Sequence, residues 1–175
     1  MTYSRILHSL SFKLIWVGTI VLAAKGHDIM AALLIWGWSI FWWLQPKLSS
    51  YSSLAIKSLL VGTIAELILC YSGIALNKTG EALFFPPLWL LGLWLAFASL
   101  LPYCLKGLHQ KLAVAAIVGA VFGPLSYNAG SNWGAMHIQS DIWGLSIIGL
   151  IWGISFPFLL VQVPLGDKPE AELAG

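Results

Sequence analysis

Long apolar stretches separated by short polar segments dominate this 175-residue chain. Because hydrocarbon about 30 Å thick is crossed at about 1.5 Å per helical residue, a membrane-spanning helix needs about 20 mostly apolar residues. The pattern predicts six helices. The first covers residues 14–24 and must extend backwards through residues 6–12 to be long enough; the others cover residues 29–44, 54–76, 86–105, 112–127 and 142–163. We therefore expect an all-α, polytopic integral membrane protein, with one compact domain of about six transmembrane helices over residues 1–165 and a short polar cytoplasmic tail over 166–175.

The composition strengthens this prediction and removes several classes of protein. The chain is 59% apolar and only 9% charged, whereas about a quarter of the residues in a soluble domain are charged. Its net charge of +2 provides no basic surface for nucleic acid. A soluble enzyme, a disordered chain and a nucleic-acid-binding protein are therefore excluded.

The positions of Lys and Arg predict the orientation in the membrane, since cytoplasmic loops carry an excess of both. With the N-terminus inside, the cytoplasmic segments hold seven of the nine, and the outer loops hold only Lys25 and Lys78. We therefore expect both termini in the cytoplasm. A cleaved signal peptide is the alternative for the first segment, with Arg5 and Lys13 as its basic region and residues 21–23 as the cleavage site. Five further spans favour a retained helix.

Glu66 is the one formal charge that falls near the middle of a predicted helix. A carboxylate at bilayer depth is costly, so it is normally buried in the bundle and protonated or partnered, and it marks a functional site by default. Gly62 and Cys70 lie on the same helical face at a spacing of four, and small residues let a second helix approach closely. Glu66 is predicted as a catalytic acid/base or proton-linked ligand; the alternative is a hydrogen bond to a neighbouring helix.

A polar block, Gly-Pro-Leu-Ser-Tyr-Asn-Ala-Gly-Ser-Asn-Trp-Gly over residues 123–134, is predicted to end the fifth helix. Pro124 removes a backbone donor, and irregular backbone is tolerated at membrane depth only inside protein or against a water-filled cavity. Tyr127 is predicted as a catalytic residue beside Glu66. The block also supplies predicted substrate-binding residues, namely Ser126, Asn128 and Asn132. An ordinary helix end with polar caps is the alternative.

Two tryptophans of the fourth predicted helix are further candidates for substrate binding. Trp89 is placed for the aromatic belt and Trp94 lies deeper, where it would line an apolar cavity. Belt and packing roles remain the alternative for both. The His and Cys residues show no ligand spacing, and no nucleotide-binding motif is present, so we predict no metal and no cofactor.

Three glycine pairs have the small-xxx-small spacing that allows close helix contact. They are Gly119 and Gly123, Gly130 and Gly134, and Gly149 and Gly153. The spacings predict a close contact involving the fifth and sixth helices, either within one chain or in a homodimer.

Several of these residues resemble a family of small bacterial inner-membrane proteins catalogued as domain of unknown function 2878. The resemblance rests on Glu66, on Pro87-x-Trp89 with Trp94, and above all on the Gly-Pro-Leu-Ser-Tyr block over residues 123–127. The family has no established activity, so no site residue follows from it. Its members are often encoded beside cyclopropane-fatty-acid-synthase-like, amine-oxidase-like and photolyase-like proteins. The resemblance therefore implies a bacterial inner-membrane protein linked to membrane fatty-acid modification or photo-oxidative stress, with lipid-modifying enzymes as partners.

The leading hypothesis is a protein that binds or modifies a lipophilic, lipid-like substrate in an outward-facing intramembrane cavity around Glu66. Membrane lipids are then its first partners. A small proton-linked transporter or lipid translocator is the second hypothesis, because a single membrane carboxyl can exchange a proton for a substrate. A non-catalytic membrane scaffold for partner enzymes is the third. The residues alone leave enzyme, transporter and scaffold open.

Overall fold

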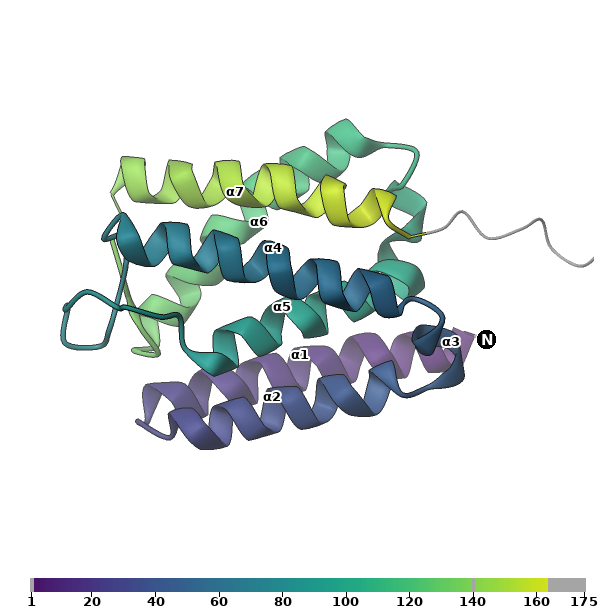
Figure 1. Ribbon diagram of the computed structural model, residues 1–175, viewed down its shortest axis with the longest axis horizontal. Coiled ribbons are helices and arrows are strands. Elements are labelled where there is room, and N and C mark those ends of the chain that lie inside the picture. Colours follow the sequence, from purple (N-terminus) through teal and green to yellow (C-terminus); the bar gives the residue numbers. More distant parts are fainter. Residues whose placement is uncertain (1, 140, 164–175) are drawn as a thin grey trace, which may run out of the picture.

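The computed structural model describes residues 2–139 and 141–163 (Figure 1). Its long helices are α1 (Thr2–Ala24), α2 (Asp28–Trp43), α4 (Ser52–Tyr71), α5 (Leu88–Leu100), α6 (Leu112–Asn132) and α7 (Ile142–Val161). Five apolar stretches of the described chain are long enough to cross a membrane, whereas α2 is a shorter apolar helix of 16 residues. The prediction of a helical membrane protein is confirmed. The predicted tail over 166–175 lies outside the described residues.

Successive long helices run in opposite directions, so α1 begins and α7 ends at the same end of the bundle (Figure 1). We call this the N-terminal end. It also carries the short helix α3 (Pro46–Ser49). At the opposite end, strands β1 (Ala75–Leu76) and β2 (His137–Ile138) pair antiparallel, and we call it the strand end. This pairing joins the segment after α4 to the segment after α6.

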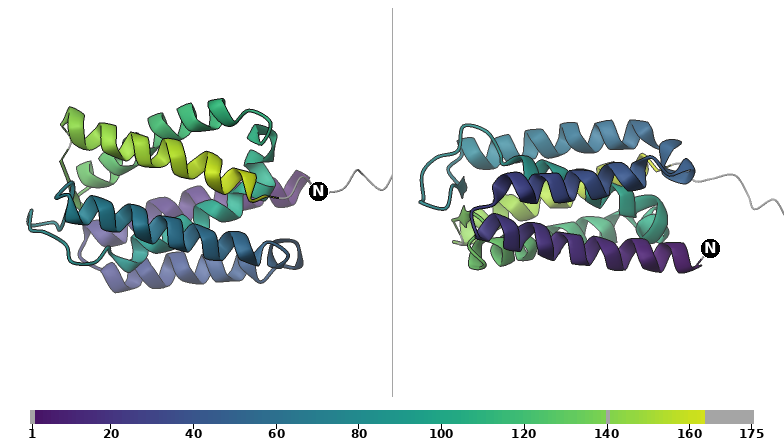
Figure 2. Two further views of the ribbon diagram at one scale, coloured as in Figure 1. Left: turned by 45° about the horizontal axis from the view of Figure 1, so that its top comes forward. Right: turned by 90° about the horizontal axis from the view of Figure 1, so that it is seen from below.

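The central helix is α5, whose sequence is apolar on every side, as expected of a helix buried all round. It packs against α1, α2 and α4. By contrast, α6 packs chiefly on α7, and these two helices lie alongside each other in Figure 2. Helix α6 has little close backbone contact with α1 or α5. The α6–α7 pair therefore joins the rest of the bundle mainly through α7, which packs against α4.

Glycines bring α6 and α7 together. A Cβ atom at Gly119 or Gly123 would overlap Trp152 of α7, and one at Gly149 would press on the backbone of α6. The predicted close contact between these two helices is therefore made within one chain. Gly134 lies beyond α6 with a φ of +83°, a turn conformation that glycine adopts readily.

Helix α6 continues to Asn132, so the prediction that it ends near Tyr127 is wrong. Pro124 lies inside the helix and leaves the Ala120 carbonyl without its usual backbone donor. That carbonyl faces Gly149 of α7, where the lack of a Cβ allows close approach. Packing against α7 thus holds α6 together across its proline.

Another predicted boundary needs correction. The third predicted helix was expected to reach residue 76, but α4 ends at Tyr71 because Gly73 turns the chain with a φ of +73°. The fourth helix reaches residue 105 as predicted, since α5 continues into a π-helix over Leu101–Leu105. In the first helix, α1 is continuous over 23 residues, which places Lys13 at its centre.

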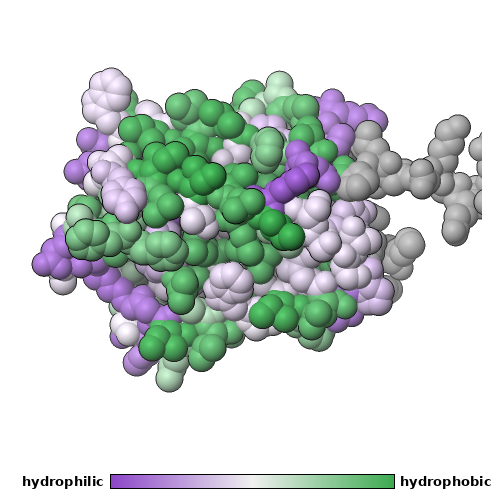
Figure 3. All heavy atoms as spheres, in the orientation of Figure 1, coloured by the Kyte–Doolittle hydropathy of each residue, from purple (hydrophilic) through white to green (hydrophobic). Residues whose placement is uncertain are grey.

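Apolar side chains cover the middle of the face seen in Figure 3, and hydrophilic ones gather mainly toward its two ends. Large apolar residues are exposed on several helices, among them Leu14 on α1, Ile64 on α4 and Leu150 on α7. Such a surface suits lipid, because exposed apolar area on this scale is rare on soluble monomers.

Candidate functional site

A hydrogen-bonded cluster around Glu66 joins α4, α5 and α6. Glu66 is fully buried, and its Oε1 accepts hydrogen bonds from Trp94 Nε1 at 2.8 Å and from the Tyr127 hydroxyl. Three of the residues selected from the sequence, separated by up to 61 positions, thus meet at one carboxyl oxygen. We call these three residues the Glu66 cluster.

The face of α4 that carries Glu66 is built to receive Trp94. A Cβ at Gly62 would overlap the Trp94 ring, so the absence of a side chain there lets the indole lie against α4 one turn from Glu66. Ser58, one turn earlier, donates its hydroxyl to the Trp94 carbonyl at 2.8 Å. The prediction that this small face of α4 is buried is confirmed, since Gly62, Glu66 and Cys70 all face inward.

Two buried polar atoms beside the cluster have no hydrogen-bond partner among the described residues. They are Glu66 Oε2 and Trp152 Nε1. Trp152 stacks on Trp94 with ring centroids 4.3 Å apart. The one ion pair found in the described chain, Lys78 with Asp28, lies elsewhere. Glu66 Oε2 and Trp152 Nε1 thus have unused hydrogen-bonding capacity. A buried polar atom without a partner is costly, so both atoms are candidates for contact with a bound molecule.

A cavity of about 610 Å³ lies between α1, α5 and α6, with two α7 side chains in its wall. Its wall is almost entirely apolar and includes Tyr127, Trp94, Trp89 and Ser126. Glu66 is not a lining residue, because Trp94 and Tyr127 separate it from the cavity. The expectation of a cavity around Glu66 is corrected accordingly: Tyr127 presents the polar group, and Glu66 contacts it from behind.

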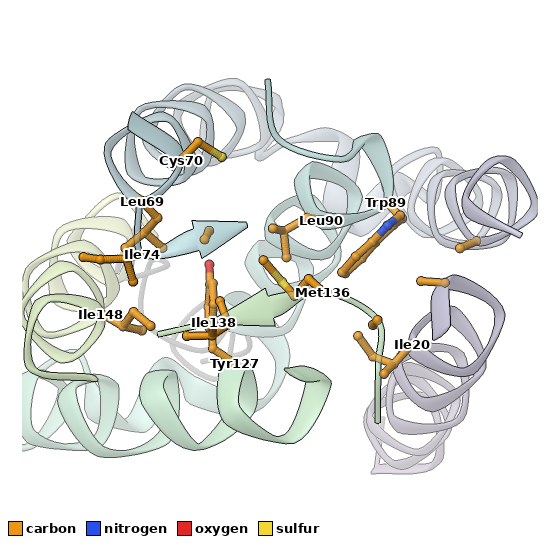
Figure 4. Packing of buried hydrophobic residues seen from close by; sticks show 14 of the residues in the cluster. Ile20, Leu69, Cys70, Ile74, Trp89, Leu90, Tyr127, Met136, Ile138 and Ile148 are labelled. Carbon is orange, nitrogen blue, oxygen red and sulfur yellow. The ribbon is translucent and has the colours of Figure 1, made fainter. Parts of the chain in front are cut away.

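Figure 4 shows how side chains from different elements converge at the strand end of this cavity. Ile20 comes from α1, Leu90 from α5, and Met136 from the segment before β2, while the Tyr127 side chain rises from α6 into the same cluster. Trp89 is anchored there, since its Nε1 donates to Asp28 Oδ1 at 3.0 Å. The strand end is thus closed by packed side chains.

The other polar residues of the 123–134 block do not form the predicted binding site together. Ser126 lines the cavity, but its hydroxyl donates to the Phe122 carbonyl of its own helix at 2.8 Å. Asn128 is half-buried and Asn132 exposed, and neither lines the cavity. The physical reason is that α6 continues through this block, so its residues point in different directions around the helix.

Sequence reasoning missed most of the cavity wall, including its charged residue and a tryptophan of α7. Lys13 is the one charged residue among the described lining residues. The backward extension of the first helix through residues 6–12 was a sign of this, because it places Lys13 inside a helix. Trp152 also lines the cavity, but no pattern in the sequence distinguishes it from the other nine tryptophans.

A second buried polar residue, His8 of α1, was also missed. His8 Nε2 lies 2.9 Å from Ser99 Oγ, and its ring stacks on Trp42 with centroids 4.2 Å apart. Tyr103 contacts the ring edge-on at 4.8 Å. None of these four residues, which we call the His8 cluster, lines the cavity. No group of three His, Cys, Asp or Glu side chains that could hold a metal ion occurs in the described ranges.

These features define a helical membrane protein in which a buried carboxyl lies behind the wall of an apolar cavity. The chain belongs to the family described as "Protein of unknown function (DUF2878)", whose model matches residues 5–158. The family assignment made from the sequence is thereby confirmed. No curated protein and no solved structure matches the chain.

Proposed function

We propose that this protein binds a lipophilic, lipid-like ligand in the cavity between α1, α5 and α6. The observation that carries the proposal is the wall itself, which is apolar and aromatic and presents the Tyr127 hydroxyl with Glu66 behind it. The volume of about 610 Å³ lies within the range of about 300–1,000 Å³ for small-molecule sites. A ligand that enters this cavity replaces its contacts with membrane lipid by contacts with the aromatic wall.

The ligand enters from the membrane. Val17 of α1 and Phe122 of α6 both line the cavity and are exposed at the surface of the protein. They mark an opening between two helices whose outer faces are apolar, as lipid-facing helices are. A molecule already dissolved in the bilayer therefore reaches Tyr127 without crossing water.

Tyr127 is the catalytic candidate that faces the ligand, and Glu66 acts through it as the proton acceptor. The Tyr127 hydroxyl donates to Glu66, so its oxygen still has acceptor capacity for a hydroxyl or amide of the ligand. A proton taken from the ligand by Tyr127 would pass along the same hydrogen bond to the carboxylate of Glu66, which is the role of a general base. Trp94 fixes the carboxyl during this exchange.

The proposal places the protein in the inner membrane of a bacterium with both termini in the cytoplasm. Without Lys13, which lies inside α1, the predicted cytoplasmic segments still hold six Lys and Arg against two in the outer loops, and this excess supports the orientation. We also propose a link to fatty-acid modification or photo-oxidative stress, because such a role would agree with a lipid-like ligand. Membrane lipids and lipid-modifying enzymes would then be the partners of the protein.

A cavity-filling variant tests the proposal. Val17→Trp adds a large ring at the opening, whereas Val21→Trp adds the same ring one turn away on α1, at a position of similar exposure that does not line the cavity. The probes are tritiated hexadecanol and tritiated palmitate, bound to the purified full chain in dodecyl maltoside micelles.

Saturable binding of at least one probe is expected, and Val17→Trp should weaken it by about tenfold, since overfilling a site costs about 1–3 kcal/mol. Val21→Trp should bind like the wild type. The absence of saturable binding by both probes, or equal binding by the two variants, would overturn the proposal.

A further inference from the structure

We infer that the ligand is a single-chain amphiphile with a carboxylate head group, and that Lys13 binds this head group. The inference rests on the proposed function and specifies the class of its ligand. It follows from the position of one cation in an otherwise uncharged wall.

Lys13 is the central residue of α1, and its side chain, although exposed at the surface, lines the cavity with Phe12 and Trp16. Its ammonium forms no hydrogen bond or ion pair with any residue that the structure describes. No Asp or Glu occurs among the lining residues of the described chain. Because a Lys inside a membrane helix normally pairs with an anion or marks a substrate pathway, the missing anion is assigned to the ligand.

The shape of the wall indicates a single chain. Along α1 the lining residues run from Phe12 to Ile20, so the apolar wall extends about 10 Å from Lys13 toward the strand end. Along α5 it runs from Leu100 to Trp89, which is about 16 Å of helix. A head group at Lys13 would therefore direct an extended chain past Tyr127 toward Trp89, and any hydroxyl or amide carried by that chain would meet the Tyr127 oxygen. No second cation that could bind a larger head group occurs among the lining residues that the structure describes.

The charge of the site favours a carboxylate. One ammonium balances one negative charge, and a charge-assisted hydrogen bond between the two is among the stronger polar contacts in proteins. A phosphate monoester carries a charge of about −1.5 to −2, which Lys13 alone does not balance. A cationic amphiphile would meet a like charge at Lys13.

The test compares three probes with the same chain, namely palmitate, hexadecanol and hexadecyl phosphate, on the purified full chain in dodecyl maltoside micelles. Palmitate should bind about tenfold more tightly than hexadecanol. Lys13→Met, which keeps an unbranched stem, should remove this preference, so that palmitate and hexadecanol bind alike. Lys13→Arg should keep it, as should Lys111→Met, which removes an exposed cation that does not line the cavity.

Hexadecanol binding also shows that each variant is folded, so a loss confined to palmitate reports on Lys13. If the wild type binds palmitate and hexadecanol equally, or if Lys13→Met leaves the preference intact, the inference is overturned while the proposed function stands. Tighter binding of hexadecyl phosphate than of palmitate would overturn the carboxylate assignment. Failure of the proposed function is distinct, because it removes saturable binding of palmitate and hexadecanol or its sensitivity to Val17→Trp.

Discussion

Two buried titratable side chains, Glu66 and His8, lie in similar surroundings at different levels of the bundle. Each is fully buried and has a hydrogen-bond partner, and each retains a polar atom without a partner among the described residues, Glu66 Oε2 and His8 Nδ1. Aromatic rings pack around both clusters. By burial and polarity alone, both would qualify as functional sites.

The two clusters differ in access. Trp94 and Tyr127, the partners of Glu66, line the cavity, whereas Ser99, Trp42 and Tyr103 around His8 do not. The contacts of His8 instead connect α1 to α2 and to the end of α5. A buried polar group therefore marks a candidate ligand site only when its partners reach a cavity. On this basis we propose that the Glu66 cluster serves ligand binding and that the His8 cluster stabilises the fold.

The largest expected effect is a loss of stability in Glu66→Ala. The substitution removes the acceptor of the Trp94 and Tyr127 hydrogen bonds, and each buried donor left unpaired costs about 1–3 kcal/mol. The free energy of unfolding, measured by SDS titration in mixed micelles, should fall by about 2–5 kcal/mol. Glu66→Gln keeps an amide oxygen as acceptor and should lose less than about 1.5 kcal/mol. Equal stability of the wild type and Glu66→Ala would refute the hydrogen bonding described for this cluster.

His8→Ala tests the other side of the comparison. It removes the ring that stacks on Trp42 and the hydrogen bond to Ser99, so unfolding in the same titration should cost about 2–4 kcal/mol less. Hexadecanol binding by the folded protein should stay unchanged, because His8 does not line the cavity. His8→Phe keeps an aromatic ring and should lose about 1 kcal/mol. A tenfold change in probe binding at unchanged stability would break the comparison.

Much of the fold follows from the sequence, because membrane-spanning helices must be long and apolar. The small face of α4 and the selection of Glu66, Trp94 and Tyr127 also follow, since a carboxyl at membrane depth needs partners. Their mutual hydrogen bonds depend on which helices are neighbours, and helical periodicity does not specify this. The sequence therefore predicts the residues of the Glu66 cluster better than their contacts.

The cavity and the His8 cluster could not be predicted for a different reason. The cavity exists because α6 packs on α7 and remains apart from α1 and α5, and this spacing depends on side-chain packing across four helices. The apolar stretch over residues 14–24 places Lys13 just before a helix, in a cytoplasmic segment. The length that a membrane span requires nevertheless implies that α1 continues through Lys13. His8 lies in an apolar stretch of α1, where a lone histidine has no distinguishing spacing.

The smallest expected effect concerns a third carboxyl, Glu81, which shows what hydrogen bonding does in water. Glu81 is exposed in the segment between β1 and α5, and its Oε2 accepts hydrogen bonds from Asn77 Nδ2 at 2.9 Å and Thr79 Oγ1 at 3.0 Å. The bond from Asn77, and after it the bond from Thr79, lower the pKa of Glu81 below its ordinary value. Glu81 thus accepts two hydrogen bonds, as Glu66 does, but without burial.

Since the folded-state pKa of Glu81 is depressed, its contribution to stability is present above the ordinary Glu pKa and is lost as pH falls through the lowered value. NMR titration of the Glu81 carboxyl should show a rise in pKa for Asn77→Ala and a smaller rise for Thr79→Val. The unfolding free energy at neutral pH should change far less than in Glu66→Ala, because water replaces the lost donors. An Asn77→Ala pKa equal to that of the wild type would contradict the assigned cause. If Asn77→Ala lost as much stability as Glu66→Ala, burial would not explain the large effect expected at Glu66.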